Sequence, residues 1–172
     1  MAKVAFEGLS EKEKEMLKAA RKVLERSYAP YSNFYVGAAV LTRDGNIITG
    51  TNYESASYGN SICAERSALL RANNQGHGDK CVAIAVVAKN RDSPTADITA
   101  PCGSCRQLIF EAAQRSGEGK NFKIIMATTN FEKIEVSTIG RLLPMAFGPD
   151  DLELEKPSKG KESEDVESRE VK

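Results

Sequence analysis

Residues 34–52 read FYVGAAVLTRDGNIITGTN. The first nine of these residues are mostly apolar and rich in β-formers, and Asp44-Gly45 is a strong signal for a hairpin turn. Residues 46–52 supply the return strand. The stretch therefore predicts a β-hairpin, and the rest of the fold is placed around it.

Helices are expected on both sides of this hairpin. Ser10 and Glu13 form a capping-box pattern, and apolar residues follow at helical spacing until Pro30 disfavours further helix. After the hairpin, Ser61 is a suitable N-cap for a second helix. The three predicted helices cover residues 11–26, 62–72 and 103–116.

Further strands alternate with these helices. They are expected over residues 81–88, 122–128 and 132–137, with a last helical turn over residues 139–143. The first of these strands is a continuous apolar run, which is typical of a buried central strand. The order of elements predicts an α/β sandwich, in which a mixed sheet carries helices on its faces.

The chain has 172 residues, of which 41% are hydrophobic and 28% charged, and its formal net charge is zero. This length suits one folded domain, and the balanced charge gives no general attraction to nucleic acid or to a membrane surface. No apolar run approaches the roughly 20 residues of a membrane span, and the N-terminus lacks the apolar segment of a signal peptide. A cytoplasmic protein is therefore expected.

The composition changes near the C-terminus. Residues 155–172 are dominated by Lys, Glu, Asp and Ser. Such a stretch buries too little apolar surface to offset its ordering entropy. We therefore expect one domain over residues 1–154 and a charged, disordered tail over residues 155–172, with a loosely docked solvated helix as the alternative.

Three of the four cysteines, Cys63, Cys102 and Cys105, occur in two short segments. The segments read ICAER at 62–66 and PCGSCRQ at 101–107. In a reducing compartment, clustered cysteines indicate metal ligands or catalysts more often than disulfides. Both segments fall at or near a predicted first helical turn, where free N–H groups and the helix dipole favour a thiolate.

Three thiolates without a fourth protein ligand are typical of a catalytic zinc site. The sequence therefore predicts one Zn²⁺ per chain, held by Cys63, Cys102 and Cys105. Glu65 follows the first thiolate by two residues and is the expected general acid and base. Arg66 is expected to offset the negative charge of the site by donating hydrogen bonds to the thiolates.

The two cysteine segments match the signature of zinc deaminases, in which Cys-Ala-Glu is followed about forty residues later by Pro-Cys-x-x-Cys. The sequence resembles the cytidine deaminase family, and specifically its small homotetrameric branch with three cysteine ligands. The resemblance covers about residues 11–152. Besides the cysteine segments, it includes the motifs YAPYSNF at 28–34, VGAA at 36–39, GTNYE at 50–54 and LLPMAFGP at 142–149.

This resemblance implies a three-layer α/β/α sandwich with a five-stranded mixed sheet. It also implies hydrolysis of cytidine or deoxycytidine to uridine or deoxyuridine and ammonia, as in pyrimidine salvage. The implied substrate contacts are Asn52 and Glu54 on the ribose, Phe34 and Val36 at the pyrimidine ring, the backbone of Ala64 at the base, and Phe147 from a neighbouring subunit of a homotetramer. Tyr31 and Tyr58 resemble positions that line the pocket or the subunit contacts.

Each of these roles has a simpler alternative. Without the resemblance, Phe34 and Phe147 are ordinary core residues, and Asn52 and Glu54 are equally well explained as solvated residues at a strand end. If the resemblance holds, the aromatic rings can pack against a planar base, and the carboxylate can accept a hydrogen bond from a sugar hydroxyl.

Three other functions remain open from the sequence. The substrate could be a modified cytosine nucleoside, such as an aminoacyl-nucleoside antibiotic. A structural zinc module would explain the cysteines, but it would not explain Glu65, and such sites normally have four protein ligands. Deamination of polynucleotide cytosine is disfavoured by the neutral charge and by a cysteine at position 63.

Overall fold

A computed structural model of the chain describes residues 2–152. The expected tail over residues 155–172 lies outside the described residues, as does the expected domain boundary at residue 154. Within residues 2–152, no helix combines the length and the apolarity needed to cross a membrane.

One mixed sheet forms the centre of the fold. Its order is β1-β6-β5-β4-β2-β3, and only β4 and β5 run parallel. The strands are β1 (Ala2–Lys3), β2 (Phe34–Thr42), β3 (Ile47–Thr51), β4 (Cys81–Asn90), β5 (Lys123–Ala127) and β6 (Ile134–Thr138). The sheet has six strands where five were expected. The extra strand β1 has only two exposed residues, too few to carry a sequence pattern, and it exists because it pairs with β6.

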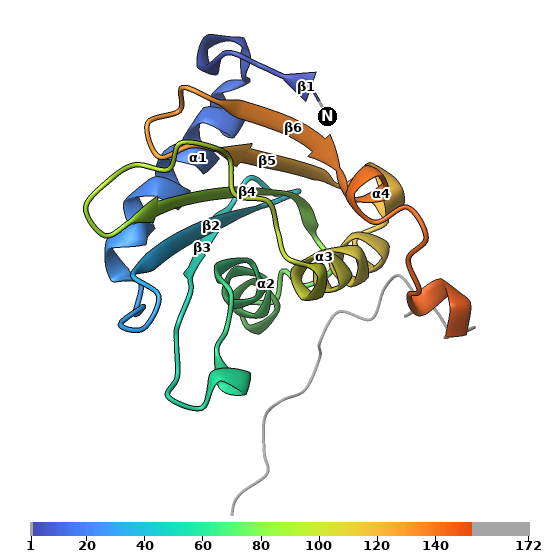
Figure 1. Cartoon of the computed structure of the whole chain (residues 1–172). Coiled ribbons are helices and arrows are strands. Elements are labelled where there is room, and N and C mark those ends of the chain that lie inside the picture. Colours follow the sequence, from blue (N-terminus) through green and yellow to red (C-terminus); the bar gives the residue numbers. More distant parts are fainter. Residues whose placement is uncertain (1, 153–172) are drawn as a thin grey trace, which may run out of the picture.

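Helices cover both faces of the sheet and so confirm the three-layer α/β/α sandwich (Figure 1). The helices are α1 (Glu11–Val23), α2 (Ala64–Asn74), α3 (Gly103–Arg115) and α4 (Ile139–Leu142). The core on one face includes Met16 and Leu17 of α1. The core on the other face joins α2 and α3 to the sheet through residues such as Leu69 and Ile109.

The start of α1 confirms the predicted capping box. The Ser10 hydroxyl accepts from the backbone N–H of Glu13, and the Glu13 carboxylate accepts from the backbone N–H of Ser10 at 2.8 Å. The helix ends at Val23 and continues as a 3-10 turn over Leu24–Arg26. The predicted hairpin is also confirmed, since β2 pairs with β3 around the turn at Asp44-Gly45.

The predicted start of the second helix is wrong. Helix α2 begins at Ala64, and its N-cap is Cys63 rather than Ser61. The reason is a tertiary contact: the backbone N–H and C=O of Ile62 both pair with Tyr53, at 2.9 Å each, and hold this residue in extended conformation. The helix can therefore start only after Ile62, and Cys63 becomes its N-cap.

Helix α2 lies very close to β3 at Gly50. A Cβ added at Gly50 would lie 2.8 Å from the carbonyl oxygen of Ala64 and would also collide with the backbone nitrogen of Ala68. Both contacts are backbone atoms of α2. Relief of the collision would therefore require the whole helix to move away from the sheet.

Gly50→Ala is expected to lower the midpoint of thermal unfolding by about 3–10 °C, because overpacking of this kind costs about 1–3 kcal/mol. Differential scanning calorimetry measures the shift. Gly59→Ala is the matched control, since a Cβ there meets no atom within 4 Å. Equal midpoints for the two variants would contradict the close packing of α2 on β3.

Candidate active site

Three cysteines converge at the N-terminal ends of two neighbouring helices. Cys63 is the N-cap of α2, Cys102 is the N-cap of α3, and Cys105 lies in the first turn of α3. Their sulfur atoms all lie within 4.8 Å of one another, and the Sγ atoms of Cys63 and Cys102 are 3.9 Å apart. Sulfur atoms around a tetrahedral zinc ion at 2.3 Å are separated by about 3.8 Å. The spacing therefore fits zinc.

The electrostatics of the cluster favour a thiolate at Cys63 and a thiol at Cys105. The positive ends of α2 and α3 both face it, and each leaves unpaired backbone N–H groups there. A hydrogen bond with Cys105 lowers the pKa of Cys63 to about 6, and the same contact raises the pKa of Cys105. Cys81 is not part of this group: it is buried at the start of β4, and burial raises its pKa to about 11.

Glu65 lies in the first turn of α2, two residues after Cys63, and only 4% of it is exposed. Burial raises the pKa of its carboxyl group above the ordinary value. A carboxyl group with a raised pKa exchanges protons more readily near neutral pH than an exposed one. Ala64, between these two residues, is fully buried.

Asn52 is tied to the start of β2. Its side-chain oxygen accepts from the backbone N–H of Val36 at 2.8 Å, and its side-chain nitrogen donates to the carbonyl of Phe34 at 2.9 Å. The expected substrate residues Phe34, Val36 and Asn52 are thus in direct contact. The predicted hairpin already placed Asn52 opposite the first residues of β2, but its two side-chain hydrogen bonds were not visible in the sequence.

Glu54 binds the loop that precedes β2. Its Oε2 atom accepts from the backbone N–H of Tyr31 at 2.9 Å and of Ser32 at 3.2 Å. The hydrogen bonds from Ser32 and Tyr31 lower the pKa of Glu54, so the group is an anion at neutral pH. Within residues 2–152, no hydrogen bond reaches its other oxygen, Oε1.

Phe147 lies in the segment that follows α4, and 61% of it is exposed. Gln107 of α3 holds this segment by donating from its side-chain nitrogen to the carbonyl of Phe147 at 2.6 Å.

The hydrogen bonds expected from Arg66 to the thiolates are not formed within the described part of the chain. Arg66 is half-buried in the first turn of α2, and its positive charge contributes to the lowered pKa of Cys63. Arg66 therefore acts on the cluster through its electrostatic attraction for the Cys63 thiolate, without a hydrogen bond.

Arg106 is a positioning residue that the sequence did not reveal. Its Nε atom donates to the carbonyl of Pro101 at 2.8 Å, and a terminal nitrogen donates to the carbonyl of Leu142 at 3.4 Å. The side chain therefore ties the residue before Cys102 to α4. Its place directly after Cys105 was visible in the motif, but its partners were not.

Arg106→Ala is expected to weaken zinc binding by about tenfold, because groups that orient metal ligands contribute about 10- to 100-fold to affinity. Competition against a chelator of known affinity measures the change. Arg115→Ala is the control, since Arg115 lies at the end of the same helix and donates to Asn73. Equal zinc affinity for the two variants would exclude the positioning role of Arg106.

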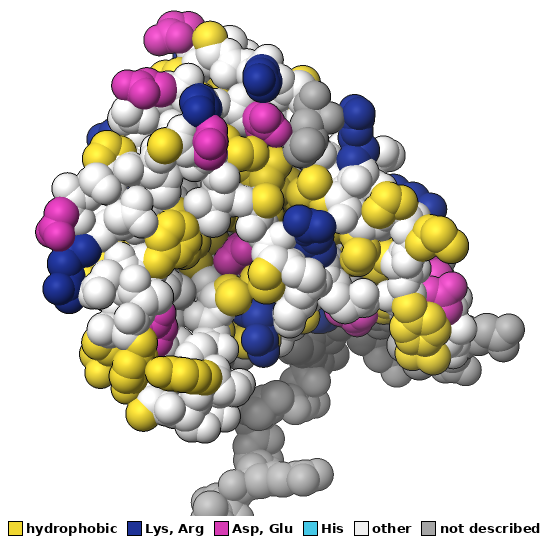
Figure 2. Space-filling model, in the orientation of Figure 1, with side chains coloured by type: hydrophobic (Ala, Val, Ile, Leu, Met, Phe, Trp, Pro, Cys, Tyr) yellow, Lys and Arg dark blue, Asp and Glu magenta, His cyan; other side chains and the backbone are white. Residues whose placement is uncertain are grey.

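Exposed aromatic side chains gather beside the site. Tyr31 and Tyr58 are 48% and 75% exposed, and their rings meet edge to face with centroids 5.8 Å apart. Tyr28 and Tyr53 form a second pair at 5.0 Å. Figure 2 shows hydrophobic side chains at the lower left, over the loops that precede β2 and α2.

The comparisons with known proteins agree with this geometry. Residues 10–116 match the family described as cytidine and deoxycytidylate deaminase zinc-binding region. The cytidine deaminase of Halalkalibacterium halodurans is 40% identical over 137 residues, which span 80% of this chain and 95% of that protein. That of Mycobacterium tuberculosis is 36% identical over 130 residues, which span 76% and 85% of the two chains. The crystal structure of cytidine deaminase from Burkholderia pseudomallei, at 38% identity, superposes with a TM-score of 0.69 and covers 81% of this chain and 100% of that chain.

Proposed function

This chain belongs to the cytidine and deoxycytidylate deaminase family, and from that membership we propose that it hydrolyses cytidine and deoxycytidine to uridine and deoxyuridine, with release of ammonia. Its cofactor is zinc, one ion per chain. The observation that carries the proposal is the convergence of three cysteine sulfurs beside a buried glutamate. Cys63, Cys102 and Cys105 are the proposed ligands.

Glu65 is the proposed proton carrier. When bound, zinc supplies Lewis acidity that lowers the pKa of water toward neutrality. Glu65 takes one proton from the attacking water and delivers it to the ring nitrogen of the pyrimidine. It then takes the second proton from the hydroxyl group formed at C4 and delivers it to the departing amine, which leaves as ammonia. Burial raises the pKa of this carboxyl group, which favours uptake of the proton by the carboxylate.

The residues around Asn52 form the proposed nucleoside site. Asn52 fixes the backbone of Phe34 and Val36, so these side chains are held in place for the pyrimidine ring. Asn52 and Glu54 are the proposed partners of the ribose hydroxyls, and Oε1 of Glu54 is available as an acceptor. The backbone of Ala64 is the proposed contact of the base.

The proposed assembly is a homotetramer in which Phe147 reaches the site of a neighbouring subunit. Support comes from its exposure. Other large apolar side chains are exposed as well, as a protein–protein interface requires. They are Tyr28, Tyr31, Tyr53, Tyr58, Leu70, Met145 and Leu152. Light scattering should give four times the monomer mass, and a monomer would contradict the proposal.

The setting proposed for this activity is pyrimidine salvage in the cytoplasm, without nucleic acid or membrane partners. The zero net charge supports the absence of a polynucleotide partner. The relatives are named for cytidine, which disfavours a modified cytosine nucleoside as the substrate.

A substrate panel tests the reaction. The purified, zinc-loaded chain is incubated with cytidine, deoxycytidine and an aminoacyl-cytosine nucleoside, and the change in ultraviolet absorbance and the released ammonia are followed. Turnover of cytidine or deoxycytidine supports the proposal. If the chain binds zinc and turns over only the modified nucleoside, the substrate is that nucleoside and not cytidine. If it binds zinc and turns over none of the three compounds, a structural zinc module is favoured.

A further inference from the structure

A hollow of the molecule lies apart from the cysteine cluster. It has a volume of about 880 Å³ and lies between three segments: α1 with its 3-10 extension, the end of β4 with the following turn, and the loop between β5 and β6. Helix α1 covers the face of the sheet opposite to α2 and α3, which carry the cysteines (Figure 1). We call this hollow the α1 cleft.

The α1 cleft is basic. Five cationic side chains line it: Lys18, Arg21, Lys22, Lys89 and Arg91. The acidic residues of its lining are Glu25 and Asp92, and Glu25 pairs with Lys89 at 2.8 Å. The other four cations have no ion pair within residues 2–152. The lining therefore carries five cations and two carboxylates, although the total charge of the chain is zero.

Two of these cations are held in place by aromatic rings. The Lys18 ammonium lies 5.7 Å from the centroid of Phe6, and the Arg21 guanidinium lies 4.9 Å from that of Phe131. The two rings stack on each other with centroids 5.2 Å apart. Such contacts restrict the side chains before any ligand arrives, so less conformational entropy is lost on binding.

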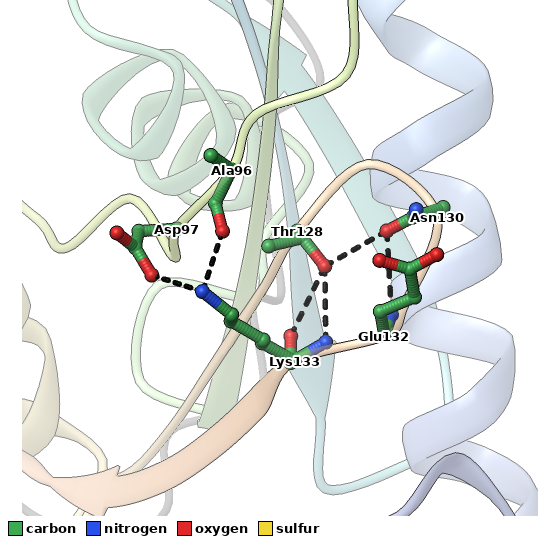
Figure 3. Close-up of polar contacts among 6 residues, drawn as sticks. All are labelled: Ala96, Asp97, Thr128, Asn130, Glu132 and Lys133. Atoms are coloured by element: carbon green, nitrogen blue, oxygen red, sulfur yellow. Dashed lines mark hydrogen bonds and ion pairs between the residues drawn. The ribbon is translucent and has the colours of Figure 1, made fainter.

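The walls of the cleft are braced against each other. Figure 3 shows Lys133, the last residue of the β5–β6 loop, donating to the carbonyl of Ala96 at 2.7 Å and pairing with Asp97, both in the segment after β4. In the same loop, the side-chain oxygen of Asn130 accepts from the Thr128 hydroxyl at 3.0 Å. Asn130 also lines the cleft, and its amide nitrogen is a neutral donor.

From these observations we propose that the α1 cleft binds an oligophosphate, meaning two or three linked phosphate groups, either free or carried by a nucleotide. Phosphate oxygens accept hydrogen bonds from both lysine and arginine, and arginine can bind them in bidentate fashion. The cations converge on one hollow rather than follow a long stripe, which suits a compact anion better than a polynucleotide. The proposal is independent of the deaminase reaction, because none of the residues assigned to that reaction lines this cleft.

Isothermal titration of the full chain with inorganic tripolyphosphate tests the proposal. The double variant Lys22→Gln, Arg91→Gln removes two cations whose side chains make no hydrogen bond or ion pair within residues 2–152. It should weaken tripolyphosphate binding by about tenfold or more, since each charge-assisted hydrogen bond lost contributes substantially to affinity. Thermal unfolding and zinc content verify that the variant is folded.

The matched control is Lys12→Gln, Lys120→Gln, which removes the same charge from exposed positions outside the cleft. Its affinity should stay within about twofold of the native value, because distant surface charges are screened by salt. A parallel titration with adenosine triphosphate separates the two sources: equal affinity indicates recognition of the phosphates alone, and tighter binding indicates a nucleotide.

Two results would overturn the proposal. One is tripolyphosphate binding that is absent, or that falls equally in the cleft variant and the control. The other is tighter binding of a long single-stranded oligonucleotide than of either small ligand, lost in the cleft variant, which would assign the surface to a polynucleotide.

Discussion

Glu65→Gln is expected to lower kcat for cytidine by about 10²- to 10⁴-fold, because general acid–base catalysis contributes an effect of this size. Glutamine has nearly the same shape but cannot accept a proton from water or deliver one to the ring nitrogen. The variant should keep its zinc, since the metal-binding group consists of Cys63, Cys102 and Cys105 without the glutamate. Steady-state kinetics and a zinc assay on the same sample measure both properties.

Glu111→Gln provides the control for this experiment. Glu111 lies in α3, beyond the first turn that holds Cys105, and its replacement removes the same carboxylate from the surface of the domain. Its kcat should equal that of the native chain. If Glu65→Gln kept full activity as well, another group would have to carry the proton, and the assignment of Glu65 would be rejected.

Cys102→Ala is expected to abolish zinc retention and to lower turnover by roughly a thousandfold or more, because water without the metal has a pKa near 15.7 rather than near 7. Two sulfur ligands cannot complete the site that the three form together. Metal analysis after gel filtration gives the zinc content. Removal of zinc from the native chain with a chelator should reproduce the loss of activity, and added zinc should restore it.

Cys81→Ala separates loss of a ligand from loss of a buried thiol. Cys81 is 1% exposed at the start of β4 and belongs to the core, not to the cluster. This variant should lose stability, by about 1 kcal/mol for a small buried side chain, and should keep one zinc per chain and its turnover. Zinc retention in Cys102→Ala at the native level would show that the cluster holds its metal in another way.

Local patterns in the sequence were sufficient for most of the fold. The capping box at Ser10 predicted the start of α1, the turn at Asp44-Gly45 predicted the hairpin, and the apolar run after Cys81 predicted the central strand β4. Each of these signals depends on residues that are neighbours along the chain. The candidate metal ligands and Glu65 were also visible, because ligand type and spacing are themselves local.

The features that the sequence did not show depend on contacts between distant segments. Residue 62 looks helical by itself, yet its pairing with Tyr53 keeps it extended and makes Cys63 the N-cap of α2. Strand β1 is too short for a pattern and exists only beside β6. Local propensity is a weak signal, and pairing between strands overrides it when backbone groups would otherwise be left unsatisfied.

The sequence by itself determined which residues this protein has for chemistry: three cysteines with ligand spacing, and a glutamate two residues after the first. The tertiary structure decided how they are held. It places the cysteine sulfurs of two helices within 4.8 Å, clamps Phe34 and Val36 through Asn52, and gathers five cations in the α1 cleft. These arrangements join residues separated by many positions along the chain, and only the packing of helices on the sheet sets the distances between them.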